Sequence, residues 1–223
     1  MEPTAPDADL PAPFRRLDLA DYRQRVASMF LSDLDLAGFR KAKDELFATH
    51  PQSPIEPEEQ PAFAGLRYYP LNDDAIVTVP IRPAHGDFAI ETNGPDGAIV
   101  YERVGILETP FGELTLWWIK AYGGGLFLPF RDGTCGRDSY GGGRYLTDTV
   151  KGTFGRGLTV LDGGRLRLDL NYAYNPSCAY DDRWACPLAP RENWLEADIR
   201  AGELAHSRFT GSAKKSPIRT GDT

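Results

Sequence analysis

The stretch that determines the fold is "AIVYERVGILETPFGELTLWWIKAYGGGLFLPF", residues 98–130. It contains three runs rich in β-branched and aromatic residues, and the turn signals "PFGE" and "GGG" separate them. Runs of this kind are typical of strands. Connections this short join antiparallel neighbours, because a parallel crossover needs a dozen or more residues. The stretch therefore predicts consecutive antiparallel strands.

The same pattern continues on both sides of this stretch. Strand-like runs precede it as "LRYYP", "AIVTVPI" and "DFAIET", and follow it as "RYL", "LTVL" and "RLRLDL". We predict a mainly β domain, an antiparallel meander that forms a barrel-like or two-sheet structure. The alternation of apolar and polar residues in "ELTLWWIKAY" and "RLRLDL" also predicts that one face of these strands meets solvent.

Two helical stretches precede the strands. The first, "LDLADYRQRVASMFLSD", places Leu19, Tyr22, Val26, Met29 and Phe30 on one face. Asp18 is its expected N-cap, and Asp35 is the expected N-cap of the second stretch, "DLAGFRKAKDELF". Prolines at positions 51, 54 and 57 must end the second helix. We expect one or two N-terminal helices packed outside the β domain.

The domain organisation follows from these patterns. Residues 1–16 are rich in Pro and Ala and are predicted to form a disordered tail. Residues 17–205 are expected to form a single domain, helical over 17–50 and β-rich over 63–205, with a long irregular C-terminal loop. The polar residues 206–223 are predicted to form a second disordered tail.

Charge and hydropathy narrow the range of partners. The chain of 223 residues has a formal net charge of −7 and a pI of about 5.0. This charge argues against nucleic-acid binding and against an anionic membrane surface, since both need a basic face. No apolar run approaches the roughly 20 residues that cross a bilayer, and "MEPTAPDADLPAPF" is not a secretory signal. We expect a soluble cytoplasmic protein with reduced cysteines, of undetermined oligomeric state.

Two irregular segments carry most of the chemically useful side chains. We name "PFRDGTCGRDSYGGGRYL", residues 129–146, the glycine segment, and "DLNYAYNPSCAYDDRWACPLAPRENWL", residues 169–195, the cysteine segment. The three consecutive glycines permit positive φ and close backbone approach. Both segments follow inner strands and lack regular structure, so we expect them to meet in space.

These two segments resemble domain-of-unknown-function family 1684, a group of bacterial and archaeal proteins. The resemblance spans roughly residues 20 to 205, including "SPI" at 53–55 and "GLRYYP" at 65–70. The other matching positions are Pro129, Phe130, Asp132, Thr134, Gly136, Tyr140 to Leu146, Asp169, Asn171, Ala173 to Pro176, Cys178 to Tyr180, Cys186 to Leu188, Pro190, Glu192, Asn193, Leu195 and "AGE" at 201–203.

Four positions depart from the family pattern. Leu170 replaces Phe, Asp138 stands where Glu is expected, Ser139 replaces Thr, and Ala189 replaces Pro. The shorter carboxylate weakens any catalytic role for Asp138. The resemblance implies no activity that could be transferred to this chain.

The cysteines suggest several kinds of site, none of them strongly. Cys178 and Cys186 are eight positions apart, whereas structural zinc ligands come in pairs two to four residues apart. A catalytic thiol needs a nearby base or cation, and the three histidines lie outside both segments. A disulfide is disfavoured in the cytoplasm. We therefore predict no metal site, and burial as small apolar groups is the ordinary role of such cysteines.

No cofactor can be identified from the sequence. There is no dinucleotide fingerprint, which disfavours nicotinamide or flavin binding through a doubly wound fold. A flavin held at a barrel interface would leave no such fingerprint.

We predict that the junction of the two segments forms a polar and aromatic pocket for a polar or anionic small molecule. Asp132 and Glu192 are the candidates for proton transfer. The candidate ligand-binding residues are Arg144, Tyr140, Tyr145, Asn171, Tyr174, Asn175 and Asn193. The alternative is a structural or interaction domain in which these motifs only close the β fold, satisfying the irregular backbone.

Overall fold

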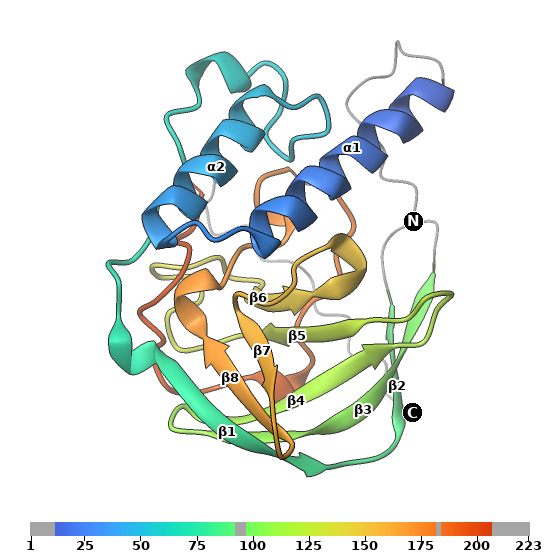
Figure 1. Cartoon of the computed structure of the whole chain (residues 1–223), viewed down its shortest axis with the longest axis vertical. Helices are drawn as coiled ribbons and strands as arrows, with labels where there is room; N and C mark the ends of the chain where they lie inside the picture. Colours follow the sequence, from blue (N-terminus) through green and yellow to red (C-terminus); the bar gives the residue numbers. More distant parts are fainter. Residues whose placement is uncertain (1–11, 92–96, 182–183, 207–223) are drawn as a thin grey trace.

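The computed structural model describes residues 12–91, 97–181 and 184–206. Within them an eight-stranded antiparallel sheet curls into a barrel-like shape (Figure 1), which confirms the predicted mainly β fold. Its strands are β1 (Ile76–Pro83), β2 (Asp87–Glu91), β3 (Ala98–Thr109), β4 (Gly112–Ile119), β5 (Leu126–Phe130), β6 (Arg144–Asp148), β7 (Leu158–Leu161) and β8 (Arg165–Asp169). Their order is β6-β5-β4-β3-β1-β8-β7, and β2 pairs with β3.

Strand β1 connects the two halves of the sheet. Its first part, Ile76 to Pro80, pairs with β8, and its last part, Ile81 to Pro83, pairs with β3. One strand thus carries the β7–β8 hairpin on one side and strands β2 to β6 on the other. The resulting curvature encloses a core rich in leucine, with Leu107, Leu128, Leu146 and Leu168 fully buried.

Two strand predictions need correction. The run "LRYYP" forms no strand, and Tyr68 makes only an isolated bridge with Glu203. The alternation of β4 does not leave its second face open to solvent, because Leu114 to Trp117 are all buried. The cysteine segment reaches that face, because the Thr115 hydroxyl donates a hydrogen bond to the Glu192 carboxylate at 3.0 Å.

The N-terminal helices are α1 (Ala12–Leu31) and α2 (Leu36–Thr49). Asp35 caps α2 as predicted, and its carboxylate accepts a hydrogen bond from the Gly38 backbone N–H at 2.7 Å. Asp18 caps nothing, because α1 begins at Ala12 and includes residues 12–16 of the predicted tail. Proline is tolerated in the first turn of a helix, so Pro13 does not prevent this start. The remaining tail residues, 1–11 and 207–223, lie outside the described residues.

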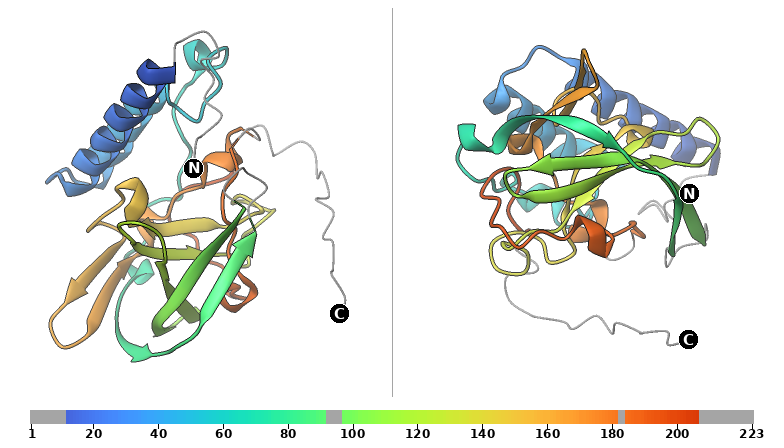
Figure 2. Two further views of the ribbon diagram at one scale, coloured as in Figure 1. Left: turned by 90° about the vertical axis from the view of Figure 1, so that its right-hand side faces the viewer. Right: turned by 90° about the horizontal axis from the view of Figure 1, so that it is seen from below.

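Both helices lie on the same side of the β domain (Figures 1 and 2). Their contact is apolar, and its buried members are Val26, Met29, Phe30, Phe39 and Leu46. Tyr172 and Tyr174 of the cysteine segment pack against this cluster, so the helices meet the sheet through that segment. None of the described helices is long and apolar enough to cross a membrane.

Candidate functional site

The glycine and cysteine segments meet through their backbones, as predicted. Tyr145 and Tyr174 exchange two backbone hydrogen bonds, of 2.8 and 2.9 Å. Farther along, the Leu195 N–H donates to the Arg131 carbonyl at 2.7 Å. Within the glycine segment, Gly143 permits a close approach to the end of β5, because its φ is +94° and a Cβ there would lie 2.5 Å from the Phe130 carbonyl oxygen.

A buried ion pair lies within the glycine segment. The side chains of Arg144 and Asp132 are both 0% exposed, and Nη2 lies 2.5 Å from Oδ2. Arg144 also donates to the carbonyls of Ile199, Ala201 and Glu203. The other carboxylate oxygen of Asp132 accepts two hydrogen bonds from residue 134. Arg144 therefore ties the glycine segment to residues 199–203.

A second buried ion pair joins α2 to the end of the domain. Lys43 contacts the Glu203 carboxylate, and the two side chains are 7% and 2% exposed. Glu203 also accepts a hydrogen bond from the Asn175 backbone N–H at 2.8 Å and one from the Tyr180 hydroxyl at 2.5 Å. The Lys43 ammonium lies 5.0 Å from the centre of the Tyr174 ring, a favourable cation–π distance. This pair holds the cysteine segment on both sides of Cys178.

The three candidate asparagines are buried and bonded to backbone groups. Asn193 donates to the carbonyls of Thr115 at 2.9 Å and Pro129 at 2.6 Å. Asn171 pairs with the N–H and carbonyl of Asn72, both at 2.9 Å, and Asn175 donates to the Leu204 carbonyl at 2.8 Å. These bonds satisfy irregular backbone that would otherwise be buried without partners.

The candidate tyrosines and Glu192 lie in different surroundings. Tyr145 is buried and donates to the Pro187 carbonyl, and the Tyr174 hydroxyl lies 3.1 Å from the Thr153 hydroxyl. Glu192 is half-buried and forms an ion pair with Arg103 at 2.8 Å. Asp132 and Glu192 therefore have different partners. The binding and proton-transfer roles given to all these residues stay predictions.

A pair of thiols lies where the two segments meet. Cys178 and Cys186 are free and partly exposed, and the Cys178 backbone N–H donates to the Cys186 sulfur at 3.4 Å. The Tyr140 hydroxyl of the glycine segment donates to the Cys178 sulfur at 3.8 Å. Lys151 and Asp148 follow the glycine segment and form a loose ion pair of 3.7 Å. Both charges influence the pKa of the Cys186 thiol.

The electrostatics of this group separate the two thiols. The hydrogen bond from Cys178 lowers the pKa of the Cys186 thiol to about 6, and Lys151 adds to this effect against the opposing effect of burial. The pKa of Cys178 is raised well above its ordinary value, because its proton is shared with Cys186 and because burial disfavours its thiolate. Burial also raises the pKa of the Asp148 carboxyl. These effects favour the thiolate form of Cys186 over that of Cys178.

Lys151 was missed by sequence reasoning. Burial alone would lower its pKa, but Asp148 and the two thiols outweigh burial and raise it, so the ammonium stays charged. It belongs to the 3-10 turn Thr149–Lys151, which follows β6. Nothing in the sequence spacing connects this turn with Cys186, because only the pairing of β6 with the cysteine segment brings them together.

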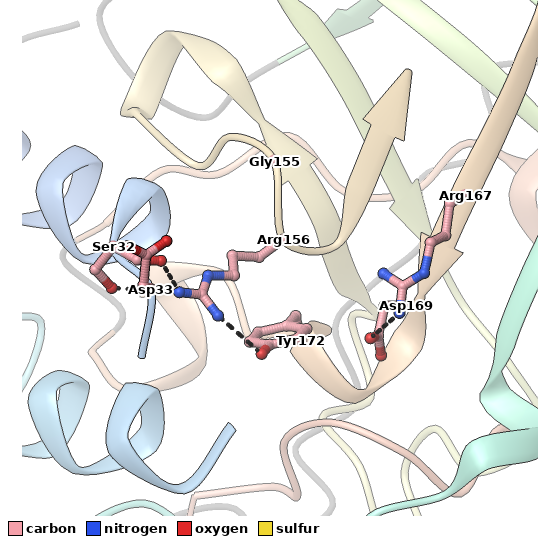
Figure 3. A pocket seen from close by; sticks show the side chains of 7 residues that line it. All are labelled: Ser32, Asp33, Gly155, Arg156, Arg167, Asp169 and Tyr172. Carbon is pink, nitrogen blue, oxygen red and sulfur yellow. Dashed lines mark hydrogen bonds and ion pairs between the residues drawn. The ribbon is translucent and has the colours of Figure 1, made fainter. Parts of the chain in front are cut away.

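Two hollows lie on the surface near the cysteine segment. One, of about 400 Å³, is bordered by residues 62–67 and 204–206 with Tyr180 among its lining residues. The other, of about 390 Å³, is shown in Figure 3. There Arg156 donates to the carbonyls of Ser32 and Leu34 just after the end of α1, and Arg167 pairs with Asp169 at 3.1 Å.

Among the described residues no group of three or more His, Cys, Asp or Glu side chains is placed to hold a metal ion.

Arg156 acts as a C-terminal cap for α1, and its removal has a measurable cost. Its guanidinium bonds the Phe30 carbonyl in the last turn of α1 and the Ser32 and Leu34 carbonyls of the connection to α2. We expect Arg156→Ala to lower the free energy of unfolding by about 2 kcal/mol in urea denaturation. The matched control is Arg167→Ala, which removes one ion pair of an arginine with a 39% exposed side chain and should cost less than about 1 kcal/mol. Equal losses in both variants would contradict the capping role.

Fold and site together define a class of protein: a barrel-like antiparallel β domain with two N-terminal helices, closed by two irregular segments that carry buried ion pairs and two thiols. The chain belongs to the family described as protein of unknown function (DUF1684), whose sequence profile matches residues 61–204.

A solved relative agrees with this assignment. It is an uncharacterised protein of Haloarcula marismortui, determined by solution NMR, with 35% sequence identity and a TM-score of 0.53. The match covers 76% of this chain and 91% of the relative. No curated protein matches the chain. Neither the family nor the solved relative carries a named activity, so function is argued from the residues.

Proposed function

We propose that this protein is a cytoplasmic small-molecule-binding or enzymatic domain whose reactive group is the Cys186 thiolate, at the junction of the glycine and cysteine segments. The observation that carries the proposal is geometric: the Cys186 sulfur accepts a hydrogen bond from the Cys178 backbone N–H at 3.4 Å. The Cys178 thiol, the Lys151 ammonium and this N–H together lower the pKa of Cys186. Thiolates are the nucleophilic form of cysteine, and reactive cysteines lie in partly exposed sites near a cation. Cys186 meets both conditions.

The surroundings of the thiolate favour a polar or anionic ligand. The Lys151 side chain is 35% exposed and carries positive charge beside the thiols. The Tyr140 hydroxyl donates to the Cys178 sulfur at 3.8 Å, and the buried ring of Tyr145 packs against the Tyr174 ring with their centres 5.8 Å apart. A cation and polar hydroxyl tips on an aromatic wall are the usual elements of a small-molecule site.

The non-catalytic alternative is supported by a different set of residues. Arg144, Asn171, Asn175 and Asn193 direct their side chains to buried backbone groups, which is what a purely structural role requires. We assign these four residues to holding the segments together. The reactive role then belongs to Cys186. The structural role and the reactive role therefore apply to different residues of the same junction.

The proposal predicts an unusual pH dependence of alkylation. With a pKa of about 6, about nine-tenths of Cys186 is thiolate at pH 7, whereas an ordinary thiol of pKa about 8.5 is almost entirely protonated. Its rate of alkylation by iodoacetamide should rise between pH 5 and 7 and then level off. Peptide mass spectrometry gives the rate for each cysteine separately. A half-maximal rate at pH 8 or above would refute the proposal.

Two variants test the cause of the low pKa. Lys151→Met and Cys178→Ala each remove a group that stabilises the thiolate, so the half-maximal pH should move upward in both. The matched control is Lys120→Met, which removes a lysine from an exposed ion pair with Asp87 and should leave the profile unchanged. A ligand screen by thermal shift at pH 7 then identifies the bound molecule through the stability it adds.

A further inference from the structure

We propose that Cys178 and Cys186 form a reversible dithiol–disulfide couple in which Cys186 attacks and Cys178 resolves. This inference rests on the proposed reactivity of Cys186 and adds a two-electron exchange with a low-molecular-weight disulfide. The starting observation is geometric. The Cys186 sulfur accepts a hydrogen bond from the backbone of Cys178 at 3.4 Å, so the two residues already lie side by side in the reduced protein.

The roles of the two cysteines follow from their surroundings. Cys186 holds the negative charge of the pair, with the Cys178 N–H and Lys151 as its stabilising groups. Cys178 holds the proton and is also contacted by the Tyr140 hydroxyl. In thiol–disulfide exchange the thiolate attacks first, and a neighbouring thiol then displaces the mixed disulfide. The structure thus distinguishes the attacking from the resolving sulfur.

The exchange balances in two steps. The Cys186 thiolate attacks one sulfur of the disulfide RSSR, a bond forms between Cys186 and that sulfur, and RS⁻ leaves and takes a proton from water. Cys186 is then neutral, so the positive charge of Lys151 acts on Cys178 alone and favours loss of its proton to solvent. The Cys178 thiolate attacks the Cys186 sulfur and releases the second RS⁻. The protein loses two electrons, and the disulfide becomes two thiols.

Cys135 provides an internal control for this chemistry. It is also free and partly exposed, but its sulfur lies 4.0 Å from the Asp132 carboxylate, and the Ser139 hydroxyl donates to it at 3.7 Å. Its neighbours are thus a carboxylate and a hydroxyl, whereas Cys178 and Cys186 lie beside each other. Cys135 should therefore react slowly and stay reduced when the other two cysteines are oxidised.

The test is incubation of the full chain with oxidised glutathione at pH 7, followed by non-reducing peptide mass spectrometry. We expect an intramolecular Cys178–Cys186 disulfide, reversed by reduced glutathione, with Cys135 unmodified. Cys178→Ala should instead accumulate glutathione on Cys186. Cys186→Ala should slow the modification of Cys178 by at least about tenfold, because the reactive thiolate is gone.

The outcomes separate the couple from the proposed function. A wild-type protein that keeps glutathione on Cys186 without closing the disulfide refutes the couple, while the low pKa of Cys186 stands. The couple is also refuted if glutathione first modifies Cys178, or if Cys135 reacts as fast as Cys186. If Cys186 fails both alkylation at pH 7 and reaction with glutathione disulfide, the proposed function fails together with the couple.

Discussion

Arg144→Met is expected to lower the free energy of unfolding by about 3–5 kcal/mol, because it leaves the Asp132 carboxylate buried without its counter-charge. The loss also includes the hydrogen bonds that Arg144 donates to the carbonyls of Ile199, Ala201 and Glu203. Those carbonyls lie inside the fold and would find no water to replace the guanidinium. Urea denaturation followed by tryptophan fluorescence measures the change.

The control for this prediction is an exposed arginine with two acidic neighbours. Arg82 lies 3.0 Å from both Glu108 and Glu113, but its side chain is 52% exposed. Arg82→Met should therefore cost no more than about 1 kcal/mol, because solvent already screens its ion pairs. The double variant Arg144→Met with Asp132→Asn should recover part of the loss, since it removes the uncompensated charge. A cost below about 1 kcal/mol for Arg144→Met alone would contradict a buried ionic role.

Glu203→Gln is the second change with a large expected effect, again about 3–5 kcal/mol of unfolding free energy. It leaves the Lys43 ammonium buried without a negative partner. It also weakens the bonds from the Tyr180 hydroxyl and the Asn175 N–H, because a neutral amide oxygen accepts less strongly than a carboxylate. Thermal and urea denaturation should both show the loss.

A double-mutant cycle measures the coupling energy between Lys43 and Glu203. Lys43→Met combined with Glu203→Gln should be more stable than the sum of the single changes predicts, by about 2 kcal/mol or more. The same cycle on Lys41 and Glu45, an exposed pair on the same helix with 80% and 68% exposed side chains, should give a coupling energy near zero. Additive effects of Lys43 and Glu203 would show that their contact does not stabilise the fold.

The Lys43–Glu203 pair also connects stability with the thiol site. Glu203 binds Asn175 and Tyr180, which lie on either side of the turn Ser177–Ala179 that carries Cys178. Gly202 permits this approach, because its φ is +77° and a Cβ there would lie 2.5 Å from the Ala173 carbonyl oxygen. The alkylation profile of Cys186 in Glu203→Gln therefore reports whether this anchoring positions the thiols.

Much of the fold could be predicted from local patterns. The strand runs around residues 98–130, the short turns between them and the Asp35 cap all depend on neighbours within a few residues. The start of α1 was missed because residues 1–16 were predicted to be a tail from their Pro and Ala content, although a proline in the first turn loses no helical hydrogen bond. The covered face of β4 was missed because alternation predicts two different faces but not what packs on each.

For the candidate site too, some features could be predicted from the sequence and others could not. The chain pattern was enough to locate the two irregular segments and to predict their meeting, because both follow strands and both need partners for their backbone groups. It gave no sign that Cys186 has a cation nearby. Lys151 reaches the thiols only because β6 pairs with the cysteine segment at Tyr145 and Tyr174.

Local sequence patterns were enough to predict the antiparallel β class, the second helix, the family and the meeting of the two segments. These depend on short-range periodicity, turn chemistry and a motif, which are all written along the chain. The burial of Arg144 and Glu203 in ion pairs and the position of Lys151 near the thiols of Cys178 and Cys186 could be learned from the folded structure alone. Charge and burial depend on distances between residues far apart in sequence, and the folded chain alone sets those distances.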